Sequence, residues 1–340
     1  MSGDLDPRSI EREIARIREK ESNPFAAGAK TNLFTLVRIR DKAGGTGDPS
    51  EAALQFLLGK RPARIITIER TAAARTEASV SGRCFPDRRN RGVCFEEVRI
   101  DSGDDELGLD PGAWTPLLVR DLPVYLWWLP GLAAGAGAVP APIRGAAELI
   151  DKLIVDTSPA GEAAGAELGA LARLRAATGG VFEISDFSWR RGRVLRELSA
   201  RAFDPPEMRP RLAELRGVDL GGASRAEALL FFSWLSSRLG WSPAGGDGGN
   251  PAFRDIDGNE VRPTHEGRGP LSGGFMLCFR FARGERLDIS CSGSGCVCSG
   301  EERGAYRFPS EGELLLEEVD SLSRDAIFPE VLDHAGTLLA

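Results

Sequence analysis

Apolar and polar residues alternate in several short runs of the first half of the chain, and this pattern is typical of β-strands. Residues 33–40 (LFTLVRIR) and 63–70 (ARIITIER) are two such runs. Between them, Asp48-Pro49 precedes a segment of helical spacing that ends near Leu58, and proline is favoured at the first position of a helix. Strand, helix and strand within about 40 residues predict a βαβ unit with parallel strands.

More elements of the same kind follow as far as residue 180. Asp110-Pro111 predicts the start of a short helix, and Ser158-Pro159 predicts the start of a long alanine-rich one that ends at Gly179-Gly180. Other runs predict strands over residues 76–84, 93–101, 124–128 and 152–156 and a helix over 143–150. The first two of these strands flank a turn-rich loop and are expected to pair as an antiparallel hairpin. The whole pattern predicts an α/β domain over residues 1–180, with a mostly parallel sheet and flanking helices.

The pattern becomes mostly helical over residues 181–245, which we expect to form a helical segment. One helix is predicted over residues 186–202. Ser224 and Glu227 form a capping box in front of a second, largely apolar helix. Residues 211–217 are the one candidate strand of this segment.

Residues 250–340 are predicted to form an α+β domain rich in hairpins. Short alternating runs predict strands over residues 253–256, 261–264, 275–281, 286–291 and 305–308. Ser310 and Glu313 form a second capping box, and a last helix is expected over 325–339. Residues 251–340 hold 16 acidic and 9 basic residues, and the formal net charge of the chain is −7. Because no region carries a strong excess of basic residues, a duplex-DNA-binding protein is excluded.

The composition is that of an ordinary folded protein of 340 residues. It is 42% hydrophobic and 27% charged, which excludes a mainly disordered chain. The apolar runs are far shorter than the roughly 20 residues of a membrane helix. The first residues lack the apolar stretch of a signal peptide. We therefore expect a cytoplasmic protein with reduced cysteines, which binds neither nucleic acid nor a membrane.

Motifs for catalysis and for cofactors are missing from the sequence. GxxxxGK[ST], HExxH and GxSxG do not occur, and the glycines at 44–47 lack the GxGxxG spacing. Residues 255–266 have acidic residues at calcium-loop spacing, but Glu260 stands where that loop needs glycine, so a hairpin turn is predicted. The chain has two histidines. These features predict a non-enzyme without cofactor or metal.

Two predicted strand ends carry candidate binding residues. Trp127 and Trp128 end one strand, and Asp156 and Ser158 follow the next. Open α/β sheets bind ligands outside the carboxyl ends of their strands, so these four residues are candidates for a ligand or partner site. In the alternative interpretation they are structural, with a tryptophan in the core and Asp156 as a helix cap.

A row of arginines marks the first helix of the middle segment. Arg191 and Arg196 lie in this row, beside Trp189 and the capping residue Asp186. Arginine forks bind phosphate and carboxylate, and tryptophan is enriched at the centres of interfaces. The four residues are therefore candidates for an anion or partner site. The alternative is a solvated helix face whose arginines pair with glutamates one turn away.

Three of the six cysteines stand close together, as Cys291, Cys296 and Cys298. Their spacing, C-x4-C-x-C, matches neither the usual zinc pattern nor the plant-type iron–sulfur pattern. A hairpin with its turn at 292–295 would place Cys291 opposite Cys296, within reach of a disulfide. Because cytoplasmic thiols are reduced by default, a redox role for this pair is a hypothesis.

Several motifs in a fixed order resemble the OpcA family, the glucose-6-phosphate dehydrogenase assembly proteins. They are LVRI at 36–39, PARIITI at 62–68, DLPVYLWWLPG at 121–131, KLIVDTS at 152–158, DFSWRRGRVLRELSARAFDPP at 186–206 and ALLFFSWLSSRLGW at 228–241. The matching positions are Trp127, Trp128, Asp156, Ser158, Asp186, Trp189, Arg191, Arg196, Asp204, Trp234, Arg238 and Trp241. Leu195 departs from the family pattern, which has an aromatic residue there, and residues 251–340 match only weakly.

The resemblance implies a bacterial, non-catalytic protein of the oxidative pentose phosphate pathway. Such a protein would promote the assembly or the allosteric activation of glucose-6-phosphate dehydrogenase through protein contacts. A second class stays open, namely a sugar-phosphate- or nucleotide-binding α/β protein or enzyme that uses Asp156 and the arginine row. A pull-down of the dehydrogenase, beside a thermal-shift screen with glucose 6-phosphate and nicotinamide nucleotides, distinguishes the two classes.

Overall fold

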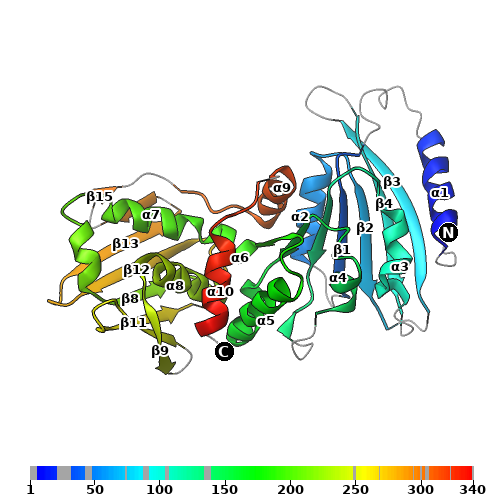
Figure 1. Cartoon of the computed structure of the whole chain (residues 1–340). Coiled ribbons are helices and arrows are strands. Elements are labelled where there is room, and N and C mark those ends of the chain that lie inside the picture. Colours follow the sequence, from blue (N-terminus) through cyan, green and yellow to red (C-terminus); the bar gives the residue numbers. More distant parts are fainter. Residues whose placement is uncertain are drawn as a thin grey trace. The chain divides into compact units, whose positions relative to one another are not determined.

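The chain folds into two compact units, each with its own sheet (Figure 1). The computed structural model describes residues 6–20, 32–42, 48–72, 75–86, 92–103, 107–133, 139–247, 250–267, 269–293, 295–298, 301–302, 306–321 and 323–338. The first unit comprises residues 1–155, 175–185 and 310–324, and the second comprises 156–174, 186–309 and 325–340. The glycine loop at 43–47 lies outside the described residues.

The sheet of the first unit has the strand order β3-β4-β2-β1-β5-β6-β7. Its strands are β1 (Thr35–Asp41), β2 (Arg64–Arg70), β3 (Glu77–Pro86), β4 (Gly92–Ser102), β5 (Val124–Trp128), β6 (Lys152–Val155) and β7 (Glu183–Asp186). Strand β1 pairs in parallel with β2 and β5, β2 with β4, and β5 with β6, whereas β3 and β4 are antiparallel. The mostly parallel sheet, the βαβ unit and the hairpin are confirmed.

The α-helices described in the first unit include three that begin at a predicted cap, namely α2 (Pro49–Leu58), α3 (Pro111–Trp114) and α9 (Glu311–Asp320). The other α-helices described there are α1 (Pro7–Lys20) and α4 (Ala141–Gly145). The Asp48 carboxylate accepts a hydrogen bond from the backbone N–H of Ser50 at 2.9 Å and caps α2. The helix expected over 143–150 is wrong, because α4 ends at Gly145, where a β-carbon would lie 2.5 Å from the Pro111 side chain.

Residues 310–324 belong to the first unit, although their sequence pattern predicts a place in a C-terminal domain. Helix α9 packs on α2. The Lys152 ammonium donates to Glu318 Oε2 at 3.1 Å and to the carbonyl of Ser321 at 2.9 Å, and the Tyr125 hydroxyl donates to the carbonyl of Val319 at 3.2 Å. These contacts join segments 166 and 194 residues apart. The two units therefore do not follow the boundaries expected at 1–180, 181–245 and 250–340.

The sheet of the second unit has the strand order β15-β14-β13-β12-β8-β11-β10-β9. Its strands are β8 (Leu215–Gly221), β9 (Ser242–Asp247), β10 (Asn250–Arg254), β11 (Glu260–Glu266), β12 (Gly274–Phe281), β13 (Arg286–Ser292), β14 (Gly295–Cys298) and β15 (Glu301–Glu302). Strand β8 is parallel to β11 and antiparallel to β12. The expected helical segment thus supplies an inner strand of the C-terminal sheet, because Val218 and Leu220 complete its buried face. The strand expected at 305–308 is wrong, since residues 306–310 have no regular structure.

Helices expected to be continuous are interrupted in the second unit. The one predicted over 186–202 separates into α6 (Phe187–Arg191) and α7 (Arg193–Phe203) at Gly192. The one expected from Ser158 starts as a 3-10 helix, η5 (Ser158–Ala163), and continues as α5 (Ala164–Ala177), with Gly161 at φ 54° near the junction. The remaining helices described are η6 (Arg209–Glu214), α8 (Arg225–Leu239) and α10 (Phe328–Leu338). Helix α8 begins at the predicted capping box.

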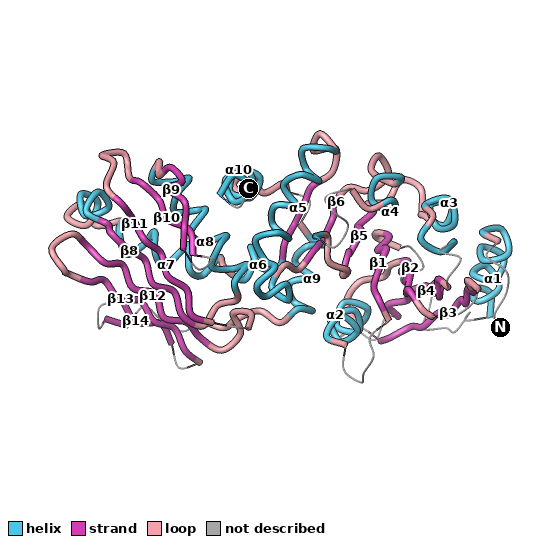
Figure 2. The backbone as a smooth tube through the Cα atoms, turned by 90° about the horizontal axis from the view of Figure 1, so that it is seen from below, coloured by secondary structure: helices cyan, strands magenta, loops and turns pink. Residues whose placement is uncertain are grey.

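The core of the second unit lies between its sheet and helices α7 and α8, and Figure 2 shows α8 on one side of the strands. Phe203 of α7 packs edge-on against Phe279 of β12, with ring centroids 5.1 Å apart. Along β12 and β13, buried residues mostly alternate with exposed or half-buried ones. One face of the sheet is therefore packed, while the other carries exposed side chains.

Candidate functional site

A buried arginine lies at the centre of the candidate site. Arg191 ends α6, and its guanidinium bridges two carboxylates. Its Nε donates to Glu227 Oε1 at 2.8 Å, and its Nη2 donates to Asp156 Oδ1 at 2.6 Å and to Ser158 Oγ at 2.7 Å. Arg191 is 3% exposed. Asp156, Arg191 and Glu227 form a buried triad.

The carboxylates of the buried triad also hold backbone groups. Glu227 Oε2 accepts from the N–H of Ser224 at 2.8 Å and from the N–H of Leu271 at 3.0 Å. Asp156 Oδ1 accepts from the N–H of Ser158 at 3.0 Å. The triad therefore joins the start of α8, the loop at Leu271 and the 3-10 helix η5. The capping box is confirmed, and its glutamate is in addition the partner of Arg191.

Burial and charge act on Arg191 in opposite directions. Removal from water lowers the pKa of the guanidinium, but the carboxylates of Asp156 and Glu227 more than offset this effect and raise the pKa above its ordinary value. An unpaired buried charge costs several kcal/mol, so each member of the triad depends on the others. The arrangement is an internal ion-pair network in which one guanidinium is shared by two carboxylates.

Asp186 lies beside the buried triad and is fully buried. Its Oδ1 accepts from the N–H groups of Ser188 at 2.9 Å and Thr157 at 3.1 Å, and its Oδ2 accepts from the Thr157 hydroxyl at 2.6 Å. Burial, together with the nearby charge of Asp156, raises the pKa of Asp186 to about 7. The predicted role of Asp186 as the cap of α6 is confirmed.

Trp189 and Arg196 form a second cluster with Asp325. The Trp189 indole donates to Asp325 Oδ2 at 2.7 Å, and the Arg196 guanidinium lies 3.3 Å from the centre of the same ring. Arg196 Nη1 also donates to the carbonyl of Trp189 at 2.9 Å. Trp189 is 2% exposed. Burial lowers the pKa of Arg196 to about 9, so this cluster is an interior one.

Trp127 and Trp128 end strand β5 in the first unit, whereas the other six partner- or ligand-binding candidates lie in the second. Both indoles are buried. In the parallel ladder they stand opposite Arg38 and Ile39 of β1. Both occupy the core, where the structural interpretation of the sequence expected one of them.

The arginine row is not one solvated face. Trp189 and Arg191, two of the candidates for an anion or partner site, are buried. Arg193 is exposed and is paired with Glu197 at 3.6 Å. A part for any of these residues in binding a partner stays a prediction.

The polar side chains described in the site form hydrogen bonds with one another. The hydroxyls of Ser158 and Ser188 bond to Arg191 and Asp156, and the His265 ring contacts the carbonyl of Ala223 at 2.9 Å. Among these residues, no group of three or more histidine, cysteine or acidic side chains is arranged to hold a metal ion. The helices described by the structure include none that is long and apolar enough to span a membrane.

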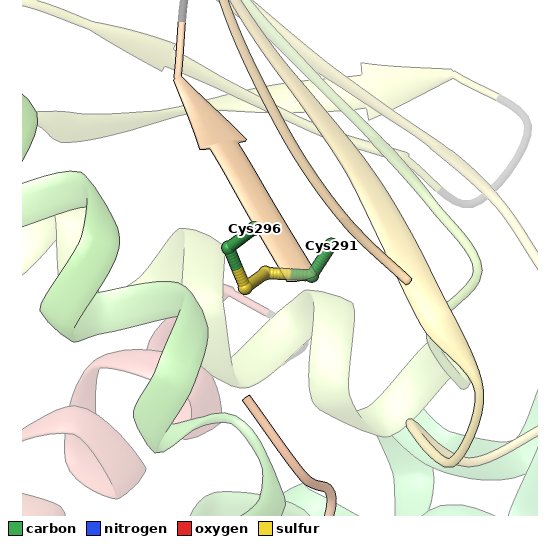
Figure 3. The surroundings of a disulfide bond; sticks show 2 residues. All are labelled: Cys291 and Cys296. Atoms are coloured by element: carbon green, nitrogen blue, oxygen red, sulfur yellow. A yellow bond between two sulfur atoms is a disulfide. The ribbon is translucent and has the colours of Figure 1, made fainter. Parts of the chain in front are cut away.

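Cys291 and Cys296 form a disulfide across the β13–β14 hairpin (Figure 3). They stand directly opposite each other in the antiparallel ladder, as expected, and both are buried. Cys278 and Cys298 are free and buried, and burial raises the pKa of the Cys278 thiol to about 11. A regulatory role for the disulfide stays a prediction.

Two members of these networks, Glu227 and Asp325, are not predictable from the sequence. Glu227 was recognised only as the third residue of a capping box, and no local pattern pairs it with Arg191, which lies 36 residues earlier. Asp325 was recognised only as the start of a helix. Neither ion pairs nor indole hydrogen bonds leave a periodic signal, so the sequence offered no means of finding these two contacts.

Two sequence models of one family match the chain in succession. Both describe a glucose-6-phosphate dehydrogenase subunit: the model of its N-terminal domain matches residues 56–175, and the model of its C-terminal domain matches residues 182–332. The chain belongs to the OpcA family. The second match includes most of the region after residue 250, so OpcA membership extends to the part whose motifs resembled the family only weakly.

Named relatives in the OpcA family come from cyanobacteria. A Synechocystis protein, named for OpcA and the OxPP cycle, is 31% identical over 193 residues, which are 55% of this chain and 39% of that protein. A Nostoc punctiforme protein of the same name is 27% identical over 252 residues, or 68% and 52% of the two chains. This chain thus spans about half or less of these relatives. Among solved structures, glucose-6-phosphate 1-dehydrogenase from Mycobacterium avium is 12% identical, with a TM-score of 0.47 over 91% of each chain.

Proposed function

We propose that this chain is a non-catalytic assembly or allosteric activator protein of glucose-6-phosphate dehydrogenase, acting in the oxidative pentose phosphate pathway. The observation that carries the proposal is the ordered match of both domains of a dehydrogenase subunit, over residues 56–175 and 182–332. A cytoplasmic location follows from the same proposal, because the activator must meet its enzyme.

The geometry of the candidate site supports a structural role for its buried residues within such a protein. The Arg191 guanidinium is already paired with the carboxylates of Asp156 and Glu227 within the second unit. A phosphate ligand would have to break the Arg191–Asp156 ion pair, which measures 2.6 Å. We infer that the buried triad and the Trp189 cluster position the helices that carry contact surfaces, and that the contacts themselves come from exposed residues.

The test combines co-purification with enzyme kinetics. Tagged chain is mixed with glucose-6-phosphate dehydrogenase from the same organism, and the mixture is analysed by size-exclusion chromatography with light scattering. NADP⁺ reduction is then measured for the chain alone, the enzyme alone and the mixture. We expect a complex, no turnover by the chain alone, and higher activity or higher oligomeric order of the enzyme in the mixture.

Two results would decide against the proposal. Turnover of glucose 6-phosphate by the chain alone would show that it is an enzyme. A chain that neither binds the dehydrogenase nor changes its activity, but whose melting temperature rises with glucose 6-phosphate or a nicotinamide nucleotide, would favour the small-molecule-binding class. Bovine serum albumin at the same mass concentration is the control for nonspecific stabilisation of the enzyme.

A further inference from the structure

The outer face of the second unit's sheet carries three adjoining rows of residues across strands β11, β8, β12 and β13. The strand register defines them. The arginine row holds Arg262, Gly217, Arg280 and Arg286; the aspartate row holds Thr264, Asp219, Cys278 and Asp288; and the methionine row holds Glu266, Gly221, Met276 and Ser290. Together they form the outer-face patch.

Charges of opposite sign stand next to each other in the outer-face patch. Arg280 Nε lies 2.8 Å from Asp219 Oδ2, and Arg286 Nη2 lies 3.6 Å from Asp288 Oδ1. The side chains of Arg286 and Asp288 are nevertheless 59% and 65% exposed. A basic strip and an acidic strip thus run side by side across the strands, and both remain accessible.

The methionine row adds an exposed apolar side chain to the patch. Met276 is 71% exposed, although β12 is an inner strand of the sheet. Its neighbours across the strands are Gly221 and Ser290, whose small size leaves Met276 projecting above the sheet. Methionine and arginine are enriched in protein interfaces.

We propose that the outer-face patch binds the same patch of a second copy of this chain in a two-fold symmetric dimer. An interface with two-fold symmetry must be complementary to itself. The two-fold axis lies in the plane of the interface and runs across the strands, between the arginine row and the aspartate row. It places the arginine row of each copy against the aspartate row of the other copy. Arg286 then faces Asp288, and Arg280 faces the aspartate row beside Asp219. This charge complementarity selects a second copy as the occupant.

The dimensions of the sheet face suit such a dimer. The four strands that carry the rows are seven or eight residues long, and at about 4.8 Å apart they make a face on the order of 19 by 23 Å. The shorter neighbouring strands β14 and β10 extend this face on either side, toward the roughly 800 Å² that each partner buries in a stable interface. The proposed dimer contains only copies of this chain, so its test does not depend on whether the chain binds the dehydrogenase.

A charge-swap experiment tests the dimer in the full chain. Arg286→Glu sets glutamate against Asp288 of the other copy, and Asp288→Arg sets arginine against Arg286. Like charges at an interface oppose association, so we expect each variant alone to raise the dimer Kd more than about tenfold. Mixing the two variants restores opposite charges, and we expect a heterodimer. Sedimentation velocity reports the masses, against 36.5 kDa for one chain.

Controls separate dimer loss from unfolding. Arg201→Glu makes the same charge change on an exposed position of α7, outside the patch, and should leave the dimer intact. Circular dichroism and thermal melts establish that each variant is folded, and Met276→Glu tests the methionine row by the same measurement. A monomeric wild-type chain at about 100 µM, or a dimer that all three patch variants leave unchanged, overturns the proposal. Failure of the two mixed charge variants to associate overturns it as well.

Discussion

The Trp189 indole donates a hydrogen bond of 2.7 Å to the carboxylate of Asp325, which lies 136 residues further along the chain. The other oxygen of the same carboxylate accepts from the N–H groups of Ile327 at 2.8 Å and Phe328 at 3.0 Å. One side chain thus caps the start of α10 and fixes the indole of α6. Because the Phe328 ring also packs at a tilt against Trp189, with centroids 5.4 Å apart, the start of α10 is held against α6.

We predict that Asp325→Ala destabilises the protein by about 1–3 kcal/mol, because it leaves a buried indole N–H unpaired and removes a helix cap. Asp325→Asn is the matched control, since its amide oxygen still accepts hydrogen bonds, and it should cost less. Urea unfolding followed by tryptophan fluorescence measures both variants. Equal stability of wild type and Asp325→Ala would contradict the role assigned to this carboxylate.

The charge of Asp325 should also contribute to acid stability. Burial opposes its ionisation, but hydrogen bonds from Phe328, Trp189 and Ile327 outweigh burial and hold its pKa below the ordinary value. A depressed carboxylate pKa stabilises the fold above the unfolded pKa of about 4, and this contribution disappears as the pH falls through the folded pKa. We expect the stability difference between wild type and Asp325→Asn to shrink below pH 4, measured by unfolding at a series of pH values.

Arg191→Ala should destabilise the second unit strongly, by about 3–5 kcal/mol, because it leaves the buried carboxylate of Glu227 and the mostly buried carboxylate of Asp156 without a counter-charge. Arg193→Ala is the matched control two residues away. Arg193 is exposed and its pair with Glu197 is a surface pair, so that variant should cost less than about 1 kcal/mol. Thermal and urea unfolding compare the two, and equal losses would argue against the buried triad.

The contribution of Asp186 to stability depends on pH with the opposite sign to that of Asp325. Its folded pKa of about 7 lies above the unfolded value of about 4, so the folded state binds more protons between these two pH values. The stability that this group contributes is therefore present in full below pH 4 and is lost as the pH rises toward 7. Asp186→Asn should flatten this part of the stability profile. Unfolding midpoints of both proteins at pH 5, 6, 7 and 8 test the prediction, and parallel profiles would contradict it.

The disulfide between Cys291 and Cys296 closes a loop with a sequence separation of 5 residues. A loop that short stabilises the fold by about 2 kcal/mol in the chain-entropy model. Reduction with dithiothreitol, or the double substitution of both cysteines by serine, should lower the free energy of unfolding by that amount. Alkylation before reduction, followed by mass spectrometry, should label neither cysteine. Full alkylation of both in oxidised protein would show that the bond does not form.

Regulation by this disulfide is a separate prediction. If the pair modulates the proposed activation of the dehydrogenase, oxidised and reduced chain should activate the enzyme to different extents. The double serine variant should then match the reduced chain under both conditions. Equal activation in every case would leave the disulfide with a structural role alone.

Helix starts were predictable from the sequence because capping is local. Ser224 and Glu227 exchange hydrogen bonds within one turn, and so do Ser310 and Glu313. Asp48 caps α2 through the N–H of Ser50, two residues away. Strands such as β1 and β5 were predictable for a related reason, since apolar runs of β-forming residues indicate burial within a sheet. In each case the residues that decide the structure are neighbours in the chain.

Tertiary structure decided which segments of the chain belong to which unit. The sequence placed residues 310–324 in a C-terminal domain, but Lys152 binds Glu318 across 166 residues. From the sequence, a lysine in a strand and a glutamate in a later helix are expected at the surface. In the structure both are buried, and each is the counter-charge of the other. Strand β8 was misplaced for a similar reason, because its pairing with β11 and β12 depends on segments that follow it.

The sequence alone determined the mostly parallel first sheet, most of the helix caps and the opposition of Cys291 and Cys296, and its ordered motifs indicated the family. Only the tertiary structure decided that Arg191 and Trp189 are interior residues, because the direction of α6 and the approach of Glu227 and Asp325 set their burial. Caps and strand alternation are fixed by atoms a few residues apart, so they leave local patterns. The pairing of buried charges is fixed by the packing of distant segments, which removes water from both partners at once and leaves no pattern in either.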